Sequence, residues 1–262
     1  MEKIITSTSN PYVKHLKKLQ TSKKYREEKG IFVLEGERPV KDALSYGVKP
    51  EALLISENRR EDFGEAVVYR LQDRVLEYIS DTKTPQGIMA EIKMPVWDAK
   101  KISPESAPFL IFSDGISDPG NLGTIIRTID AGGGGGIVLG QGTVDIYNPK
   151  TVRGTMSSLF NVPLYRSADN AQTINILKNK GYYIVGTRME NASLYTETDF
   201  KRPTVLVMGN EANGISDAVM KLYDEFVKIP IAGKIESLNV AVSAAVIIYE
   251  AVRQRNIREI NT

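Results

Sequence analysis

The feature that most constrains the fold is a series of short, unbroken apolar runs in the second half of the chain, separated by segments with helical periodicity. Continuous apolar runs of this length are typical of strands buried on both faces, as in a parallel sheet covered by helices. We therefore predict a doubly covered parallel α/β sheet there. The predicted strands are 109–114, 136–140, 162–166, 182–187 and 204–209, and the predicted helices are 121–131, 171–180, 216–223 and 239–253.

The first part of the chain shows a second, smaller alternation of strands and helices. It predicts a helix that starts at Pro11, strands at 31–36, 52–56, 67–71 and 87–92, and helices at 37–46 and 73–79. Residues 97–108 are polar, include two prolines and lack periodicity, which predicts a linker. The expected organisation is an N-terminal α/β domain (1–96), a linker (97–108) and a C-terminal parallel-sheet domain (109–262).

The residue types present exclude several kinds of chemistry. The chain has no cysteine, which excludes thiolate zinc sites, iron–sulfur clusters and cysteine nucleophiles. Its one histidine, His15, argues against Ser-His-Asp hydrolysis and multi-histidine metal sites. No run reaches the roughly 18 apolar residues of a membrane helix, and the N-terminus shows no apolar signal-peptide core. We expect a soluble cytoplasmic protein without a metal.

The net charge of +2 hides an uneven distribution. Residues 1–30 hold eight Lys/Arg and three Asp/Glu, so most of the excess positive charge lies there. Such a segment suits contact with nucleic-acid phosphates, although a solvated basic helix face explains it equally well. The candidate phosphate contacts are Lys14, Lys17, Lys18, Lys23 and Lys24.

Three segments place small and polar residues directly after apolar strands, which is where ligands bind in α/β sheets. The first, 113–131, contains Asn121 and Arg127, the latter the only charge in the stretch LGTIIRTI. The second, 207–217, contains Gly209-Asn210-Glu211 and Gly214, ahead of a helix that Ser216 would cap. Glycine at these positions would let backbone approach a ligand closely.

The third segment, 227–252, runs from Ile229-Pro230 through Ser237-Leu238-Asn239 into a helix rich in alanine and valine. Taken singly, each segment also fits an ordinary strand–loop–helix connection, and Arg127 fits an arginine that extends from a helix flank into solvent. The five glycines at 132–136 follow a helix and precede a strand, so we interpret them as a helix end and a turn.

Together and in this order, the three segments resemble the motifs of the SpoU/TrmH-type family of RNA ribose methyltransferases, within the SPOUT superfamily. Segments 32–44 and 82–93 are similar to the substrate-binding domain of that family. The resemblance implies a C-terminal domain with a deep trefoil knot, a homodimer, and S-adenosylmethionine as cofactor. The glycine run departs from the family, which usually has a mixed Ala/Gly turn there.

The resemblance also implies roles for individual residues. Arg127 would hold the RNA phosphate and assist deprotonation of the ribose 2′-hydroxyl, oriented by Asn121, Glu211, Ser237 and Asn239. The cofactor would be held by Thr187, Gly209, Asn210, Gly214, Ile229, Leu238 and Asn239. Arg153 would contact RNA, or is an ordinary surface arginine.

The implied activity is 2′-O-methylation of RNA, with large-subunit ribosomal RNA favoured as substrate because a separate RNA-binding domain suits a large structured target. Three alternatives remain open at this stage. They are a transfer RNA 2′-O-methyltransferase, a methyltransferase for a base or a protein, and a non-catalytic, ribosome-associated RNA-binding protein.

Overall fold

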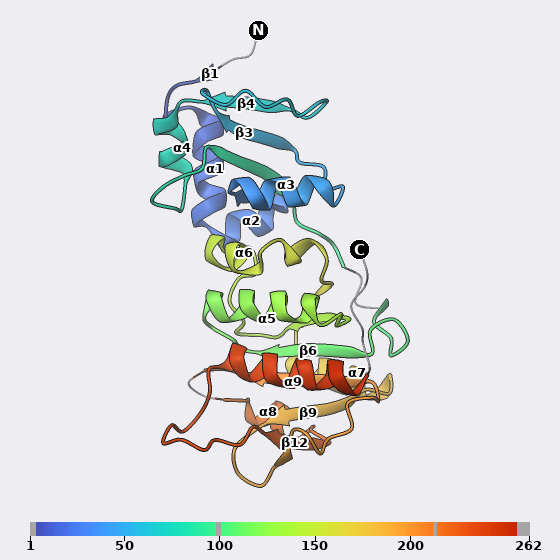
Figure 1. Ribbon diagram of the computed structural model, residues 1–262. Helices are drawn as coiled ribbons and strands as arrows, with labels where there is room; N and C mark the ends of the chain where they lie inside the picture. The colour runs from blue at the N-terminus through green and yellow to red at the C-terminus, as the bar shows by residue number, and fades with distance from the viewer. Residues whose placement is uncertain (1–3, 98–100, 212–213, 256–262) are drawn as a thin grey trace. The chain divides into compact units, whose positions relative to one another are not determined.

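The structure is a computed structural model that describes residues 4–97, 101–211 and 214–255. The chain forms two compact units (Figure 1). Unit 1 comprises residues 1–95 and 145–160, and unit 2 comprises residues 96–144 and 161–262.

Unit 1 is built on a five-stranded mixed sheet in the order β1-β4-β3-β5-β2. Strands β2 and β3 run antiparallel to β5, whereas β3 and β1 run parallel to β4. Helices α1 and α4 bury Leu16, Leu19 and Val75 against sheet residues such as Leu54 and Met89. The strands are β1 (Ile4–Ile5), β2 (Ile31–Glu35), β3 (Ala52–Ser56), β4 (Val68–Leu71) and β5 (Ile88–Lys93), and the helices are α1 (Pro11–Thr21), α2 (Lys23–Lys29), α3 (Glu37–Ser45) and α4 (Asp73–Ile79).

These elements confirm the predicted strands and helices of this region to within a residue or two. Helix α1 begins at Pro11, and the side chain of Asn10 caps it by accepting a hydrogen bond from the Tyr12 amide (2.8 Å). The basic segment nevertheless forms two helices, because Ser22 has extended backbone angles and its hydroxyl caps α2. Strand β1 is only two residues long and was not predicted.

Residues 145–160 belong to unit 1, although the sequence pattern assigns them to the C-terminal domain. They contain α6 (Pro149–Thr155) and a short 3-10 helix, η2 (Ser158–Phe160). An ion pair between Arg26 and Asp145, 2.5 Å apart and almost fully buried, ties the segment to α2. The Tyr147 ring packs against Phe32 at a centroid distance of 4.9 Å. The domain boundaries expected from the sequence (1–96, 97–108 and 109–262) are not tested by these contacts and stay a prediction.

Unit 2 contains a seven-stranded, fully parallel sheet in the order β10-β12-β9-β11-β6-β7-β8, which confirms the predicted fold class. The strands are β6 (Phe109–Asp114), β7 (Gly136–Leu139), β8 (Leu164–Arg166), β9 (Tyr183–Thr187), β10 (Ser193–Leu194), β11 (Thr204–Gly209) and β12 (Glu225–Lys228). The helices are α5 (Pro119–Ala131), α7 (Asn170–Asn179), α8 (Asp217–Met220) and α9 (Val240–Gln254).

Helices cover both faces of this sheet. On one face, α7 and α8 pack on the side chains of Leu110, Phe112 and Val207. Successive side chains of a strand point to opposite faces, so Ile111 and Leu206 face the other side. There α5 and α9 pack against each other and on the sheet, as Figure 1 shows. The trefoil knot stays a prediction of the resemblance.

Two helices of unit 2 differ from their predicted ranges. Helix α5 begins at Pro119 rather than Asn121, because Asp118 is the N-cap and accepts a hydrogen bond from the Asn121 amide (2.8 Å). Helix α8 is shorter than the predicted 216–223. Ser216 occupies its N-cap position, but the Ser216 side chain makes no capping bond.

The glycine run is a helix end and a turn, as predicted. Helix α5 ends at Ala131, Gly132 is its C-cap, and β7 begins at Gly136. A Cβ atom at Gly135 would lie 2.4 Å from the Cα atom of Ala107. Gly136 has φ +141°, and a Cβ atom there would lie 2.7 Å from the carbonyl oxygen of Pro163. Neighbouring backbone therefore leaves no room for side chains at these two positions.

Candidate active site

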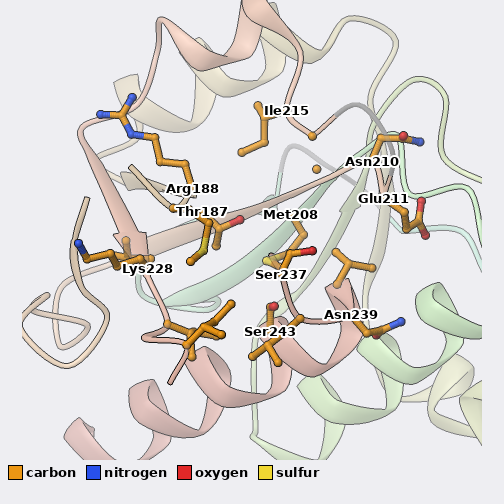
Figure 2. A pocket seen from close by; sticks show the side chains of 18 residues that line it. Thr187, Arg188, Met208, Asn210, Glu211, Ile215, Lys228, Ser237, Asn239 and Ser243 are labelled. Atoms are coloured by element: carbon orange, nitrogen blue, oxygen red, sulfur yellow. The ribbon is translucent and has the colours of Figure 1, made fainter. Parts of the chain in front are cut away.

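The carboxyl ends of β9, β11 and β12 meet at one edge of the sheet of unit 2. Val207 in β11 is in register with Gly186 in β9, and Val227 in β12 is in register with Thr187. A cavity of about 390 Å³ opens at this edge (Figure 2). It is lined by Thr187, Arg188, Met189, Met208, Gly209, Asn210, Glu211, Gly214, Ile215, Val227, Lys228, Ile229, Ile231, Ser237, Leu238, Asn239, Val240 and Ser243.

All seven residues predicted to bind the cofactor are in this lining, and so are three of the five predicted catalytic residues, Glu211, Ser237 and Asn239. Three segments far apart in the sequence supply them, after β9, after β11 and between β12 and α9. The side chains of Thr187, Met208, Ser237 and Ser243 turn toward the middle of the cavity (Figure 2). The second and third sequence segments therefore coincide with the cavity, whereas the first contributes no residue to its lining.

The loop after β11 folds tightly on itself. Asn210 and Gly214 exchange two backbone hydrogen bonds of 2.8 and 2.9 Å, and Gly214 has φ +68°. A Cβ atom at Gly209 would lie 2.5 Å from the carbonyl carbon of Gly214. From the sequence, we expected this glycine to let the backbone approach a ligand closely. In the structure, the backbone that approaches Gly209 belongs to Gly214 and Ile215 of its own loop.

The Glu211 carboxylate joins this loop to the N-terminus of α5. Its Oε2 atom accepts hydrogen bonds from the Ser117 amide (3.0 Å) and hydroxyl (2.8 Å). Its Oε1 atom accepts from the Asp118 amide (3.2 Å) and from Nδ2 of Asn121 (2.9 Å). The N-terminus of a helix favours a negative charge, so the carboxylate fits this position electrostatically as well.

These hydrogen bonds fix the ionisation state of Glu211. Partial burial alone would raise the pKa of this carboxyl group above its ordinary value of 4.5. The hydrogen bonds from Asn121 and Ser117 outweigh the burial and lower the pKa to about 2. Glu211 is therefore a carboxylate, and accepts hydrogen bonds only, throughout the physiological pH range.

Asn239 extends the same network to the third segment. It is the N-cap of α9, and its Oδ1 atom accepts hydrogen bonds from the amides of Ala241 (2.9 Å) and Val242 (3.2 Å). Its Nδ2 atom donates to Oδ1 of Asn121 (2.9 Å). Glu211, Asn121 and Asn239 thus form one hydrogen-bonded chain that links all three motifs.

Two residues of the cavity wall have main-chain groups that could bind a ligand. Within the described residues, the backbone amides and carbonyls of Ile229 and Leu238 take part in no hydrogen bond. The Arg188 guanidinium points away from the cavity (Figure 2), stacked 3.8 Å from the ring centroid of Phe226. Among the residues that the structure covers, no three His, Cys, Asp or Glu side chains form a group suited to a metal.

Arg127 lies on α5, outside the cavity lining, with its side chain exposed. It is six residues beyond Asn121, so the two side chains point about 120° apart around the helix axis. In the described part of the chain, no hydrogen bond or ion pair holds its guanidinium. The structure thus brings Asn121 to the cavity edge but not Arg127, and the catalytic roles of both stay predictions.

The residues predicted to bind RNA all belong to unit 1. Lys14, Lys18, Lys23 and Lys24 are exposed, whereas Lys17 is half-buried with its Nζ atom 5.3 Å from the ring centroid of Tyr78. Arg153 on α6 forms an ion pair with Asp81 (2.8 Å). Their role in RNA binding stays a prediction.

Sequence reasoning missed two residues of this network, Ser117 and Asp118. Both bind Glu211 through their backbone amides, which leave no signal in residue type, and Ser117 also donates through its hydroxyl. The signals in the sequence are the serine itself and the placement of both residues between a strand end and Pro119, which favours a helix start.

Comparison with known proteins gives a consistent result. Residues 108–249 match the sequence profile of the SpoU rRNA Methylase family, and residues 10–90 match that of the MRM3-like substrate binding domain. The chain is 38% identical over 250 residues to the 23S rRNA (guanosine(2553)-2′-O)-methyltransferase RlmP of Bacillus subtilis, covering 94% of this chain and 98% of that protein.

Solved structures also resemble most of the chain. The SpoU methyltransferase AviRb of Streptomyces viridochromogenes in complex with AdoMet is 30% identical, with a TM-score of 0.86 and coverage of 94% of this chain and 98% of that one. An AdoMet-bound rRNA methyltransferase of Sinorhizobium meliloti is 32% identical, with a TM-score of 0.86 and coverage of 96% and 97%.

Proposed function

Because the chain belongs to the SpoU rRNA methylase family, we propose that it transfers a methyl group from S-adenosylmethionine to a ribose 2′-hydroxyl of large-subunit ribosomal RNA. The observation that carries this proposal is the chain of hydrogen bonds through Glu211, Asn121 and Asn239 at the edge of the cavity. It holds together three segments that match the motifs of the family.

The cavity fits the cofactor. Its volume of about 390 Å³ lies in the range of small-molecule sites. Met208, Ile215 and Leu238 supply apolar surface for an adenine ring, and the free main-chain groups of Ile229 and Leu238 supply hydrogen bonds. When bound, S-adenosylmethionine supplies an activated methyl group on a positively charged sulfur.

The residues of the site would position the acceptor and stabilise its charge. A ribose hydroxyl must lose its proton as its oxygen attacks the methyl carbon in line, and alignment of the two substrates supplies much of the rate. Arginine stays protonated in proteins, so Arg127 would hold the RNA phosphate and favour the deprotonated hydroxyl by electrostatic attraction. Asn121, Glu211, Ser237 and Asn239 would orient the hydroxyl and the loops.

The position of Arg127 supports a homodimer. Its exposed guanidinium lies outside the cavity of its own chain, so it would act at the cavity of the partner. Helix α9, which packs beside α5, exposes the apolar side chains of Val242 and Tyr249, 49% and 53% accessible. Apolar side chains of this size on one helix suit a protein–protein contact.

A mixing experiment tests the dimer. Arg127→Ala and Gly209→Val proteins, each with strongly reduced activity by itself at a low S-adenosylmethionine concentration, should regain part of the activity when they are unfolded and refolded together. Mixed dimers would then contain one cavity that has both an intact cofactor loop and the partner's arginine. Absence of any regained activity in a mixture that light scattering shows to be dimeric would contradict the arrangement.

Unit 1 would hold the RNA. Lys14, Lys18, Lys23 and Lys24 present exposed positive charges on α1 and α2, which suits contact with phosphates whatever the base sequence. A cytoplasmic location of the protein is consistent with a ribosomal substrate and with a chain that has no cysteine.

Mapping of 2′-O-methyl groups tests the proposed function. Total RNA from cells with and without the gene would be compared at nucleotide resolution, and the purified protein would then be given S-adenosylmethionine and RNA from the deletion strain. We expect one ribose position in large-subunit ribosomal RNA to lose its methyl group and to regain it in vitro. Loss of a methyl group only from transfer RNA, or from a base, would replace this substrate with one of the alternatives.

A further inference from the structure

Asp114 is a buried carboxylate near the cavity, and the proposed mechanism assigns it no role. It is the last residue of β6, is only 4% exposed, and does not line the cavity. Its Oδ2 atom accepts hydrogen bonds from the Ser216 amide (2.8 Å) and hydroxyl (2.9 Å). Its Oδ1 atom accepts from Nδ2 of Asn170 (2.6 Å).

Through Ser216, Asp114 holds one end of the loop that follows β11. That loop contributes Gly209, Asn210, Glu211, Gly214 and Ile215 to the cavity wall. Its beginning is held at the same place, because Nδ2 of Asn210 donates to the carbonyl oxygen of Gly115, the next residue after Asp114 (2.8 Å).

Through Asn170, Asp114 also reaches the loop that follows β7. Asn170 is the first residue of α7, and its Oδ1 atom accepts a hydrogen bond from the Gln141 amide (2.7 Å). A chain of hydrogen bonds thus runs from Ser216 through Asp114 and Asn170 to Gln141. It connects the ends of three neighbouring strands, β11, β6 and β7.

The donors and acceptors in this series of hydrogen bonds match in only one arrangement. Asp114 accepts on both oxygens, whereas Asn170 donates on one side and accepts on the other. If an amide replaces the carboxylate, its NH₂ group faces the NH₂ group of Asn170. Rotating the Asn170 amide would only move the conflict to the Gln141 amide, and an unmatched buried polar group is costly.

We propose that Asp114 is a positioning residue for the cofactor: it holds residues 214–216 against the end of β6, and so keeps Gly214 and Ile215 in the cavity wall that binds S-adenosylmethionine. The inference rests on the proposed function, which supplies the identity of the ligand. It predicts that a change at position 114 weakens cofactor binding in a protein that is still folded.

The first test is calorimetric titration of Asp114→Asn with S-adenosylmethionine. We expect the dissociation constant to rise by roughly tenfold to a hundredfold, the effect of losing hydrogen bonds to a buried charged group. Glu250→Gln is the matched control, because Glu250 is a buried carboxylate of the same unit that bonds Arg253 and Gln254 and does not line the cavity. It should lower the melting temperature and leave cofactor affinity unchanged.

The second test is the exchange Asp114→Asn with Asn170→Asp in one protein. The amide at position 114 would still accept from Ser216 with its oxygen, and its NH₂ group would donate to the carboxylate at position 170. That carboxylate would also accept from the Gln141 amide, so every hydrogen bond regains a matched partner. We expect the dissociation constant to return to within about threefold of the wild-type value, since the matched bonds are restored.

The outcomes distinguish failure of this inference from failure of the proposed function. Wild-type affinity in a folded Asp114→Asn protein would overturn the inference alone, and so would a folded double variant that binds no better than the single one. Failure of the wild-type protein to bind S-adenosylmethionine would overturn the proposed function and the inference together. If Asp114→Asn does not fold, Ser216→Ala, which removes only the hydroxyl donor, should still weaken binding by a few fold, and unchanged binding would again overturn the inference.

Discussion

The edge of the cavity in unit 2 and the basic segment of unit 1 both gather polar side chains, but they hold them differently. At the cavity edge, Asn121 is fixed from two sides by hydrogen bonds of 2.9 Å, one to Glu211 and one from Asn239. In the basic segment, Lys18 is exposed, and its ammonium group only lies over the ring of Tyr25, 5.6 Å from the centroid.

The difference fits the two tasks proposed for these regions. In-line methyl transfer requires reacting atoms aligned at about 3–3.5 Å, so the groups around them must be held firmly. Attraction of a phosphate acts over a screening length of about 8–10 Å in ordinary salt, so mobile lysines suffice. Single substitutions should therefore have large effects at the cavity edge and small, cumulative effects in the basic segment.

The largest effect is expected for Arg127→Ala. It should reduce methyl transfer by at least roughly a hundredfold, because the proposed electrostatic contact to a developing charge would be lost, while the dissociation constant for S-adenosylmethionine stays within a few fold. Single-turnover kinetics and calorimetry measure the two quantities. Lys221→Ala, at an exposed cation of the same unit, should change neither, and wild-type turnover by a folded Arg127→Ala protein would remove Arg127 from the site.

The second largest effect is expected for Gly209→Val. The added Cβ atom would lie within 2.5–2.7 Å of the backbone at Gly214 and Ile215, so the loop must move, and we expect cofactor binding to weaken by more than roughly tenfold. Gly233→Ala is the control, since no atom lies within 4 Å of a Cβ atom at that position. Equal calorimetric affinities for the two variants would mean that the loop conformation does not matter to the cofactor.

Glu211→Gln should change the pH dependence of stability. The pKa of Glu211 is about 2 in the folded protein against an ordinary value of 4.5. Its contribution to stability is therefore complete above pH 4.5 and is lost as the pH falls toward 2. Thermal melts between pH 6 and 2 should show a smaller loss of stability for Glu211→Gln than for the wild type, whereas Glu65→Gln, at an exposed position, should follow the wild type.

The smallest effect per residue is expected for the lysines of unit 1. Changing Lys14, Lys17, Lys18, Lys23 and Lys24 together to glutamine should weaken RNA binding and reduce the slope of log affinity against log salt by roughly 3.5 to 4.5 if each lysine contacts one phosphate. Each single change should weaken binding by only a few fold, and none should alter cofactor affinity. An unchanged salt slope for the fivefold variant would mean that the segment is a solvated helix face.

Most of the fold could be predicted from the sequence because its strands are continuous apolar runs. The elements that could not be predicted have no such run of apolar residues. Strands β1 and β10 have two residues each, too few for a pattern. The place of residues 145–160 depends on Asp145 meeting Arg26, which is 119 residues earlier in the chain, and no local pattern reports such a pairing.

Many residues of the candidate site could be named from the sequence, but the contacts that hold them in place could not. The resemblance identified Asn121, Glu211 and Asn239, whose side chains the structure joins. It could not show that backbone amides hold Glu211, because every residue except proline has one. Asp114 could not be identified from the sequence for a related reason. A polar residue at the end of a strand is common, and the importance of this one depends on its hydrogen-bond partners at positions 170 and 216.

The ion pair between Arg26 and Asp145 affects how the protein can be divided. A fragment that stops before residue 109 would keep every strand of the first sheet but lose Asp145, leaving the buried guanidinium with two backbone carbonyls as its remaining partners. Removing one member of a buried pair costs about 3–5 kcal/mol, a large share of the stability of a small domain. The two halves are therefore poor modules for truncation, fusion or recombination, since a crossover between them in the gene would separate charges that fold together.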